Sequence, residues 1–189
     1  MTRHVVYTSL FLAMLLAQAT GAGACSDASD PWLELAVAVQ AGDDERFACL
    51  IKQVGVNAYD PSDLWENTPL HIAAVHDQPA MARQMIDAGA EVNRQNAAGK
   101  TPLRMAIDEG ADDTAATLIF GDADLEVPDF EGRTMLFWAV ARDNASIARL
   151  LVEHGANRAQ IFNVNGRDET ISSYARRRGN REIILLFTE

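Results

Sequence analysis

The chain has 189 residues, of which 48% are hydrophobic and 23% charged, and its formal net charge is −11. This composition supplies enough apolar material for a folded core and excludes a disordered chain. The acidic balance also argues against binding to nucleic acid, because phosphate backbones are bound through Lys and Arg.

The first 24 residues have the layout of a bacterial export signal. Basic side chains precede an apolar run over residues 5–17, which is too short to span a membrane comfortably, and small residues follow it. Cleavage sites of the small-x-small type precede both Thr20 and Cys25, and we favour the second. We therefore expect a signal peptide over residues 1–24 and a secreted or periplasmic mature chain over residues 25–189, with no membrane span.

The two cysteines, Cys25 and Cys49, leave three interpretations open. In an oxidising compartment they can form a disulfide bond that ties the amino-terminal tail to the first helices. Cys49 can instead be a small buried apolar residue on a helix. Cys25 follows small residues, as the lipidated cysteine of bacterial lipoproteins does, although Ala22 stands where those proteins usually have Leu.

The rest of the chain is built from a repeated unit. Thr68, Thr101 and Thr134 follow one another at a spacing of 33 residues. Each unit is typical of a short helix that opens at Thr-Pro, a tight turn, a second helix, a glycine stop and a polar loop. Longer segments recur in the same register: residues 67–74 at 100–107 and 133–140, and residues 88–93 at 154–157.

These motifs resemble the ankyrin repeat. The resemblance rests on Thr68-Pro69-Leu70-His71, Gly99-Lys100-Thr101-Pro102-Leu103 and Gly89-Ala90-Glu91-Val92-Asn93. It implies an all-α ankyrin-repeat solenoid of helix-turn-helix units joined by hairpin-like loops. We divide residues 25–189 into five units, the outer two acting as caps: residues 31–62, 63–95, 96–128, 129–161 and 162–189.

Four places depart from the family pattern. Glu66 stands where the second unit should have its opening glycine, and Met135 replaces the proline of the fourth unit. Gly121 comes one place early in the third unit, with Asp122 at the usual glycine position, which predicts a shifted helix end. In the last unit Gly166 precedes the helix-opening Thr by four residues rather than two.

No residue pattern indicates an enzyme, a metal site or a cofactor. The sequence has no nucleophile elbow, no Gly-rich phosphate loop and no cluster of histidines. In the resembled family the residue equivalent to His71 hydrogen-bonds adjacent repeats. Asp112 and Asp113 lie where helix starts favour acids, and Phe137 and Trp138 are expected in the core.

In ankyrin arrays the loop tips and the exposed side of the first helices line a concave groove that contacts partners. Trp65 and Phe130 are candidate anchors at loop tips, although Trp65 could fold back onto Leu64. Asp108 and Glu109 are expected as peripheral acids of an acidic groove. Transferred position by position, the partner-binding residues are Trp65, Asn67, His76, Lys100, Asp108, Glu109, Phe130, Arg133 and Arg142.

The resemblance therefore implies a non-catalytic, monomeric protein-binding module or adaptor. The net charge indicates that its one protein partner is basic. Exported bacterial ankyrin-repeat proteins include immunity proteins that neutralise effector toxins and stress-defence partners of periplasmic enzymes. An envelope lipoprotein tethered through Cys25 is the alternative, and the sequence does not separate these roles.

Overall fold

The structure is a computed structural model that describes residues 30–59, 63–164 and 166–188. The predicted signal peptide and Cys25 lie outside the described residues, so cleavage and the Cys25–Cys49 disulfide stay predictions. Within the described ranges ten helices form five consecutive pairs. The pairs are α2 (Pro31–Ala41) with α3 (Asp44–Val54), α4 (Pro69–Val75) with α5 (Pro79–Asp87), α6 (Pro102–Glu109) with α7 (Asp112–Phe120), α8 (Met135–Ala141) with α9 (Ala145–Glu153), and α10 (Ile171–Arg178) with α11 (Arg181–Leu185).

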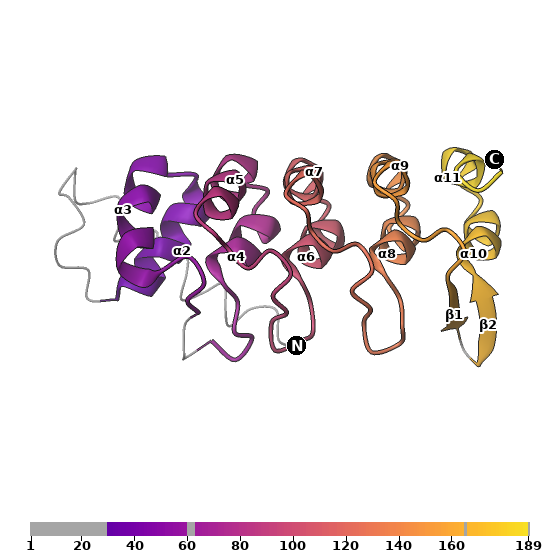
Figure 1. Ribbon diagram of the computed structural model, residues 1–189, viewed down its shortest axis with the longest axis horizontal. Coiled ribbons are helices and arrows are strands. Elements are labelled where there is room, and N and C mark those ends of the chain that lie inside the picture. Colours follow the sequence, from indigo (N-terminus) through magenta and orange to yellow (C-terminus); the bar gives the residue numbers. More distant parts are fainter. Residues whose placement is uncertain (1–29, 60–62, 165, 189) are drawn as a thin grey trace.

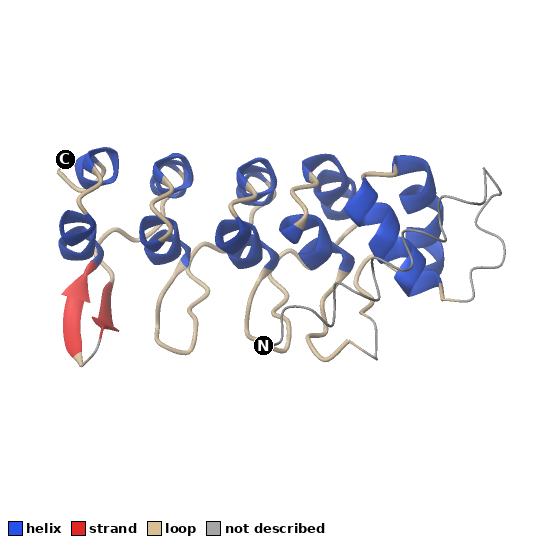
Figure 2. Ribbon diagram, turned by 180° about the vertical axis from the view of Figure 1, so that it is seen from behind, coloured by secondary structure: helices blue, strands red, loops and turns tan. Residues whose placement is uncertain are grey.

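The helices form two rows along the molecule (Figures 1 and 2). We call α2, α4, α6, α8 and α10 the inner helices and the other five the outer helices. The loops that precede α4, α6 and α8 project to one side, and we call them fingers. The all-α solenoid fold is thus confirmed. None of the helices in the described ranges combines the length and apolar character needed to cross a membrane.

The last unit replaces the finger with an antiparallel β-hairpin that the sequence analysis did not predict. Strand β1 (Ile161–Val164) pairs with β2 (Arg167–Thr170), with Ile161 opposite Thr170. The four-residue spacing between Gly166 and Thr170 provides the second strand. The irregular spacing therefore reflects a longer, hydrogen-bonded arm in the position of a finger (Figure 2).

Threonine caps begin most of the inner helices. Thr101 accepts a hydrogen bond from the Arg104 backbone N–H at 3.2 Å, and Thr170 accepts one from that of Ser173 at 3.2 Å. Thr134 instead donates its hydroxyl to Gln160 Oε1 at 2.8 Å. The threonine of the fourth unit, which also lacks the helix-opening proline, therefore bonds to the residue before the hairpin instead of capping its own helix.

Two departures from the glycine pattern are accommodated by the backbone. Glu66 has φ of 52°, close to the 70° and 76° of Gly99 and Gly132 at the equivalent positions. Asp122 has φ of 60°, and α7 keeps the nine-residue length of α5 and α9. The predicted shift of this helix end is therefore wrong, because Asp122 itself adopts the left-handed conformation, which Asp tolerates better than most residues.

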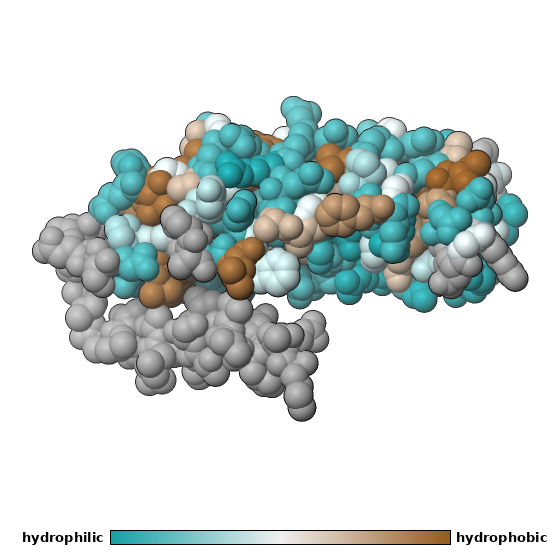
Figure 3. All heavy atoms as spheres, turned by 90° about the horizontal axis from the view of Figure 1, so that it is seen from below, coloured by the Kyte–Doolittle hydropathy of each residue, from teal (hydrophilic) through white to brown (hydrophobic). Residues whose placement is uncertain are grey.

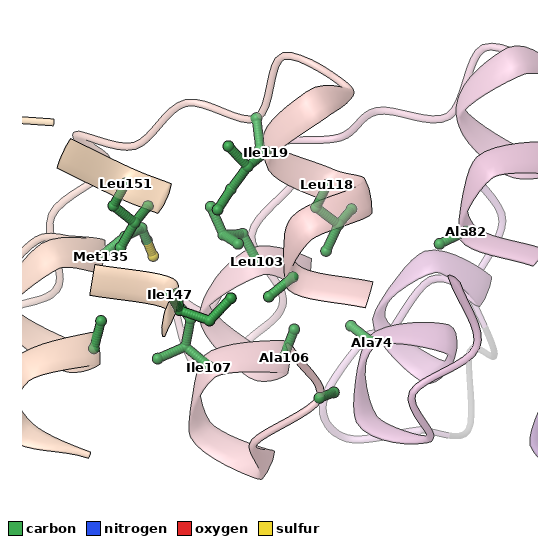
Figure 4. Close-up of a cluster of buried hydrophobic side chains, with 14 of the residues drawn as sticks. Ala74, Ala82, Leu103, Ala106, Ile107, Leu118, Ile119, Met135, Ile147 and Leu151 are labelled. Atoms are coloured by element: carbon green, nitrogen blue, oxygen red, sulfur yellow. The ribbon is translucent and has the colours of Figure 1, made fainter. Parts of the chain in front are cut away.

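The core is continuous from the first unit to the last because each pair of helices covers the apolar face of the next. Leu70, Leu103 and Leu136 occupy equivalent positions, and each is at most 1% exposed. Figure 4 shows Leu103 among the buried side chains between neighbouring helices of successive units. Stability is thus distributed over the interfaces between units rather than concentrated in one centre.

We predict that Leu103→Ala lowers the free energy of unfolding by about 2–5 kcal/mol, since it leaves a cavity in a fully buried layer. Trp65→Ala should cost less than about 1 kcal/mol, because that side chain is 51% exposed. Chemical denaturation of both variants measures the difference. Equal losses would mean that the inside and outside of the array are wrongly assigned.

A second prediction concerns Glu66, a non-glycine residue with positive φ at an exposed finger position. Glu66→Gly should raise the free energy of unfolding by about 0.5 kcal/mol, because relief of Cβ strain outweighs the entropy cost of glycine. Glu66→Ala is the control, since it keeps the Cβ and should give no gain. A gain in the alanine variant would trace the effect to the carboxylate instead.

Candidate protein-binding face

The inner helices and fingers form the face on which partner contacts were predicted. Figure 3, which looks at this finger side, shows hydrophobic patches scattered over a mostly hydrophilic surface. Leu64 is 89% exposed, Trp65 51% and Phe130 91%. Because Leu64 is so exposed, Trp65 does not bury it by folding back. The two predicted aromatic residues are therefore both open to solvent near the fingertips.

Neighbouring fingers support each other. The Ala97 backbone N–H donates to the Trp65 carbonyl at 2.8 Å, and the Phe130 ring lies 3.3 Å from where a Cβ on Gly99 would be. Asn67 has a structural role, because its amide oxygen accepts from Asn96 Nδ2 at 2.9 Å. These contacts hold the fingers in a fixed order along the face.

His71 ties the second unit to the third, as the resemblance implies. Its Nδ1 accepts from the Thr68 backbone N–H at 3.2 Å, which leaves Nε2 to donate to the Lys100 carbonyl at 3.0 Å. The ring is fully buried, and this burial lowers its pKa from 6.5 to about 4. His76 is only half-buried at the end of α4; burial lowers its pKa, partly opposed by the carboxylate of Glu109.

Asp108 is the centre of a charge network on α6. Its carboxylate accepts from Lys100 Nζ at 2.9 Å, Arg104 Nη2 at 3.1 Å and Arg142 Nη2 at 2.9 Å. Its side chain is only 5% exposed. The expectation of a peripheral acid is therefore wrong for Asp108, because α6 turns it toward Arg104, four residues earlier on the same helix face. Glu109 is exposed, as expected.

The network continues to the next inner helix through Arg104. The Arg104 guanidinium carbon lies 3.4 Å from the centre of the Trp138 ring, and that of Arg133 lies 4.4 Å from it. Asp129 accepts from Trp138 Nε1 at 3.2 Å and from Arg133 Nε at 2.8 Å. We call this group, together with Glu131, which pairs with Arg133, the Arg–Trp cluster; its members are Lys100, Arg104, Asp108, Asp129, Glu131, Arg133, Trp138 and Arg142.

The ionisation of the cluster follows from its pairing. Burial raises the pKa of Asp108, but hydrogen bonds and charges from Lys100 and Arg104 outweigh it and hold the pKa below 3.8. Burial likewise raises the pKa of Asp129, and hydrogen bonds from Arg133 and the Glu131 backbone bring it below 3.8. Burial lowers the pKa of Arg104, whose Nε has no hydrogen-bond partner among the described residues. Both carboxylates are therefore charged at neutral pH.

The local charge is opposite in sign to that of the whole chain. Four cations, Lys100, Arg104, Arg133 and Arg142, meet three acids, Asp108, Asp129 and Glu131. The cluster itself is therefore not acidic. Glu109, at the end of α6, and Asp143, just after α8, add two further exposed acids to these units, so the acidic groove stays a prediction.

An open pocket of about 590 Å³ adjoins the cluster, between the finger that precedes α8 and the hairpin. Its walls include Arg133, Phe137 and Trp138 from the fourth unit and Asn163 and Tyr174 from the fifth. The rings of Phe137 and Tyr174 are 5.1 Å apart, and the half-buried Trp138 packs edge-to-face against Phe137, also at 5.1 Å. The pocket thus combines aromatic walls with the ion pair of Arg133 and Glu131, and aromatic walls are typical of sites that bind apolar groups.

Comparison with known proteins decides the family. The ankyrin-repeats family, in three copies, matches residues 35–129, and the single ankyrin repeat matches residues 131–164. The chain is an ankyrin-repeat protein.

Similar proteins share only this array. The chain is 30% identical to the B-cell lymphoma 3 protein homolog of Mus musculus over 130 residues, 67% of this chain and 29% of that protein. It is 27% identical to the neurogenic locus notch homolog protein 1 of Homo sapiens over 150 residues, 61% of this chain and 6% of that protein. The ankyrin-repeat protein therefore corresponds to less than a third of these relatives.

The sequence analysis missed Arg104 and the role of Trp138. Arg104 stands at the position of His71 in the repeat, and Asp108 follows at helical i,i+4 spacing, so this pair could have been predicted. Phe137 is buried, as expected, but Trp138 is only half-buried and lines the pocket. Within the described residues no group of three or more His, Cys, Asp or Glu could hold a metal ion.

We predict that the free energy of unfolding falls as the pH drops from 6.5 toward 4. The unfolded chain protonates His71 near 6.5, whereas the folded chain keeps it neutral to about pH 4, so acid favours the unfolded state by up to about 3 kcal/mol. Asp108 and Asp129 contribute mainly around and below pH 3.8, where the unfolded chain takes up their protons.

Denaturation at several pH values in a His76→Gln background isolates this effect, because burial lowers the pKa of His76 as well. The additional change His71→Gln should flatten the pH dependence. An unchanged slope without His71 would contradict the assignment.

Proposed function

We propose that this ankyrin-repeat protein is a non-catalytic binding module of the periplasm that holds one protein partner against its third to fifth units. The family's ankyrin arrays are protein-interaction modules, which supports the general role. The pocket beside the Arg–Trp cluster is the observation that supports the third to fifth units as the binding region. Trp, Tyr and Arg dominate the energetics of protein interfaces, and the pocket presents all three.

The cluster presents these side chains in fixed positions. Trp138 is held by its hydrogen bond to Asp129 and by the guanidinium groups of Arg104 and Arg133. Tyr174 is packed against Phe137 and Phe162. Side chains that are already ordered lose little entropy on binding, so a preorganised surface favours tight association. The exposed fingertip residues Trp65 and Phe130 offer a second, separable contact.

The periplasmic location rests on the predicted signal peptide. Within it, we propose an adaptor that serves as the immunity protein of an effector toxin or as a stress-defence partner of a periplasmic enzyme. Cys25 at the predicted mature terminus favours one alternative, a lipoprotein tether. Separation of membrane and soluble fractions for wild type and Cys25→Ser distinguishes the lipoprotein tether from the unanchored adaptor. Only a lipidated chain loses its membrane association in the serine variant.

The binding face is tested by filling the pocket without removing any contact. Ala141 lines the pocket at the end of α8, and Ala141→Met should weaken partner affinity at least roughly tenfold by steric exclusion. Ser146→Met on outer helix α9, an exposed position, is the matched control. The measurement is binding kinetics of a partner captured from periplasmic extract by the mature chain.

Trp65→Ala in the same assay tests the fingertips. A loss at Trp65 with wild-type affinity in Ala141→Met would move the interface to the fingertips. Wild-type affinity in both variants would reject the proposed face altogether.

A further inference from the structure

The Arg–Trp cluster contains more positive charge than its acids neutralise at the surface. Asp108 offers one negative charge to Lys100, Arg104 and Arg142. Arg104 also reaches Asp129 at 3.8 Å, but Asp129 is already paired with Arg133 at 2.8 Å, and Arg133 also contacts Glu131. One positive charge is left over across the whole cluster.

That surplus lies on Lys100 and Arg142. Their side chains are 41% and 48% exposed, whereas those of Arg104 and Asp108 are 9% and 5% exposed. Neither the Lys100 ammonium nor the Arg142 guanidinium uses all its N–H donors on Asp108, since they carry three and about five donors respectively. Glu109, the next acid on α6, faces His76 and forms no ion pair with Arg142 in the described residues.

Arg142 lies next to a residue of the pocket wall. Ala141 lines the pocket, and Arg142 follows it directly in the chain. The exposed Arg178 donates to the Ala141 carbonyl at 3.2 Å. A peptide that places an apolar side chain in the pocket would therefore lie near the guanidinium groups of Arg142 and Arg178.

Building on the proposed binding function, we propose that the partner is an acidic segment, which inserts an apolar side chain into the pocket and places a carboxylate between Lys100 and Arg142. One surplus charge matches one singly charged carboxylate. This reverses the basic partner that the net charge indicates, because the contacted surface, rather than the whole chain, decides local complementarity. The carboxylate gains charge-assisted hydrogen bonds from donors that Asp108 already holds in place.

A peptide library tests this without knowledge of the natural partner. Random dodecapeptides displayed on phage are selected against the full mature protein, and an enriched peptide is then titrated by fluorescence anisotropy. We expect Asp and Glu to be enriched over Lys and Arg. The double variant Lys100→Gln, Arg142→Gln should weaken the peptide at least roughly tenfold and reduce the salt dependence of its affinity.

The matched control is Lys52→Gln, Arg149→Gln, which removes the same charges from exposed positions on outer helices α3 and α9 and should bind like wild type. In the double variant Arg104 still pairs with Asp108, so this buried carboxylate keeps a cationic partner. The single Arg142→Gln variant repeats the test while Asp108 keeps both Arg104 and Lys100. Equal affinity for both double variants, or selection of basic or neutral peptides, would overturn the proposal.

The Ala141→Met variant shows whether only the acidic-partner proposal fails or the proposed binding function fails as well. If basic or neutral peptides are selected and Ala141→Met abolishes their binding, the pocket is a binding site and only the acidic partner is wrong. If the selected peptides bind wild type, Ala141→Met and the Lys100, Arg142 variant equally, both proposals fail.

Discussion

The whole structure depends on one constraint: no unit can bury its own apolar face, so each must be covered by the next. The leucines at the start of successive inner helices are buried for this reason. Side chains also satisfy backbone donors across the junctions, as Asn57 does for the Glu91 N–H at 2.8 Å and Asn93 for the Asp124 N–H at 2.8 Å. Register between units therefore fixes where every side chain of the binding face stands.

This constraint explains why so much of the fold could be predicted from sequence. A contact that must be made at every junction leaves a residue at the same place in every copy, and the spacing of 33 residues records it. The bridge from His71 to the next unit was predicted instead from the resemblance to the ankyrin repeat. The conformation of Asp122 and the β-hairpin were not, because each depends on residues that occur in one copy only and carry no repeated signal.

The candidate site was harder to predict because its pairs form between copies. The Asp108–Arg142 pair joins neighbouring inner helices, and the Arg104–Trp138 stack does the same. The resemblance to ankyrin arrays placed Lys100, Asp108, Arg133 and Arg142 on one face, but it did not show which charges neutralise one another. Net charge could not show this either, because it sums over the whole chain.

Residues 71, 104 and 137 occupy the same position in three successive units, and comparing them shows how the cluster lowers stability. His71 uses this place to bridge two repeats and Phe137 uses it to fill the core. Arg104 places a buried cation there, whose Nε has no hydrogen-bond partner within the part of the chain that the structure describes. Burying a guanidinium carries a desolvation penalty that ion pairs offset only in part. The histidine of the second unit shows that a less costly solution for stacking exists within the same chain. A costly exception beside an open aromatic pocket supports the proposal that this junction is built for binding rather than for stability.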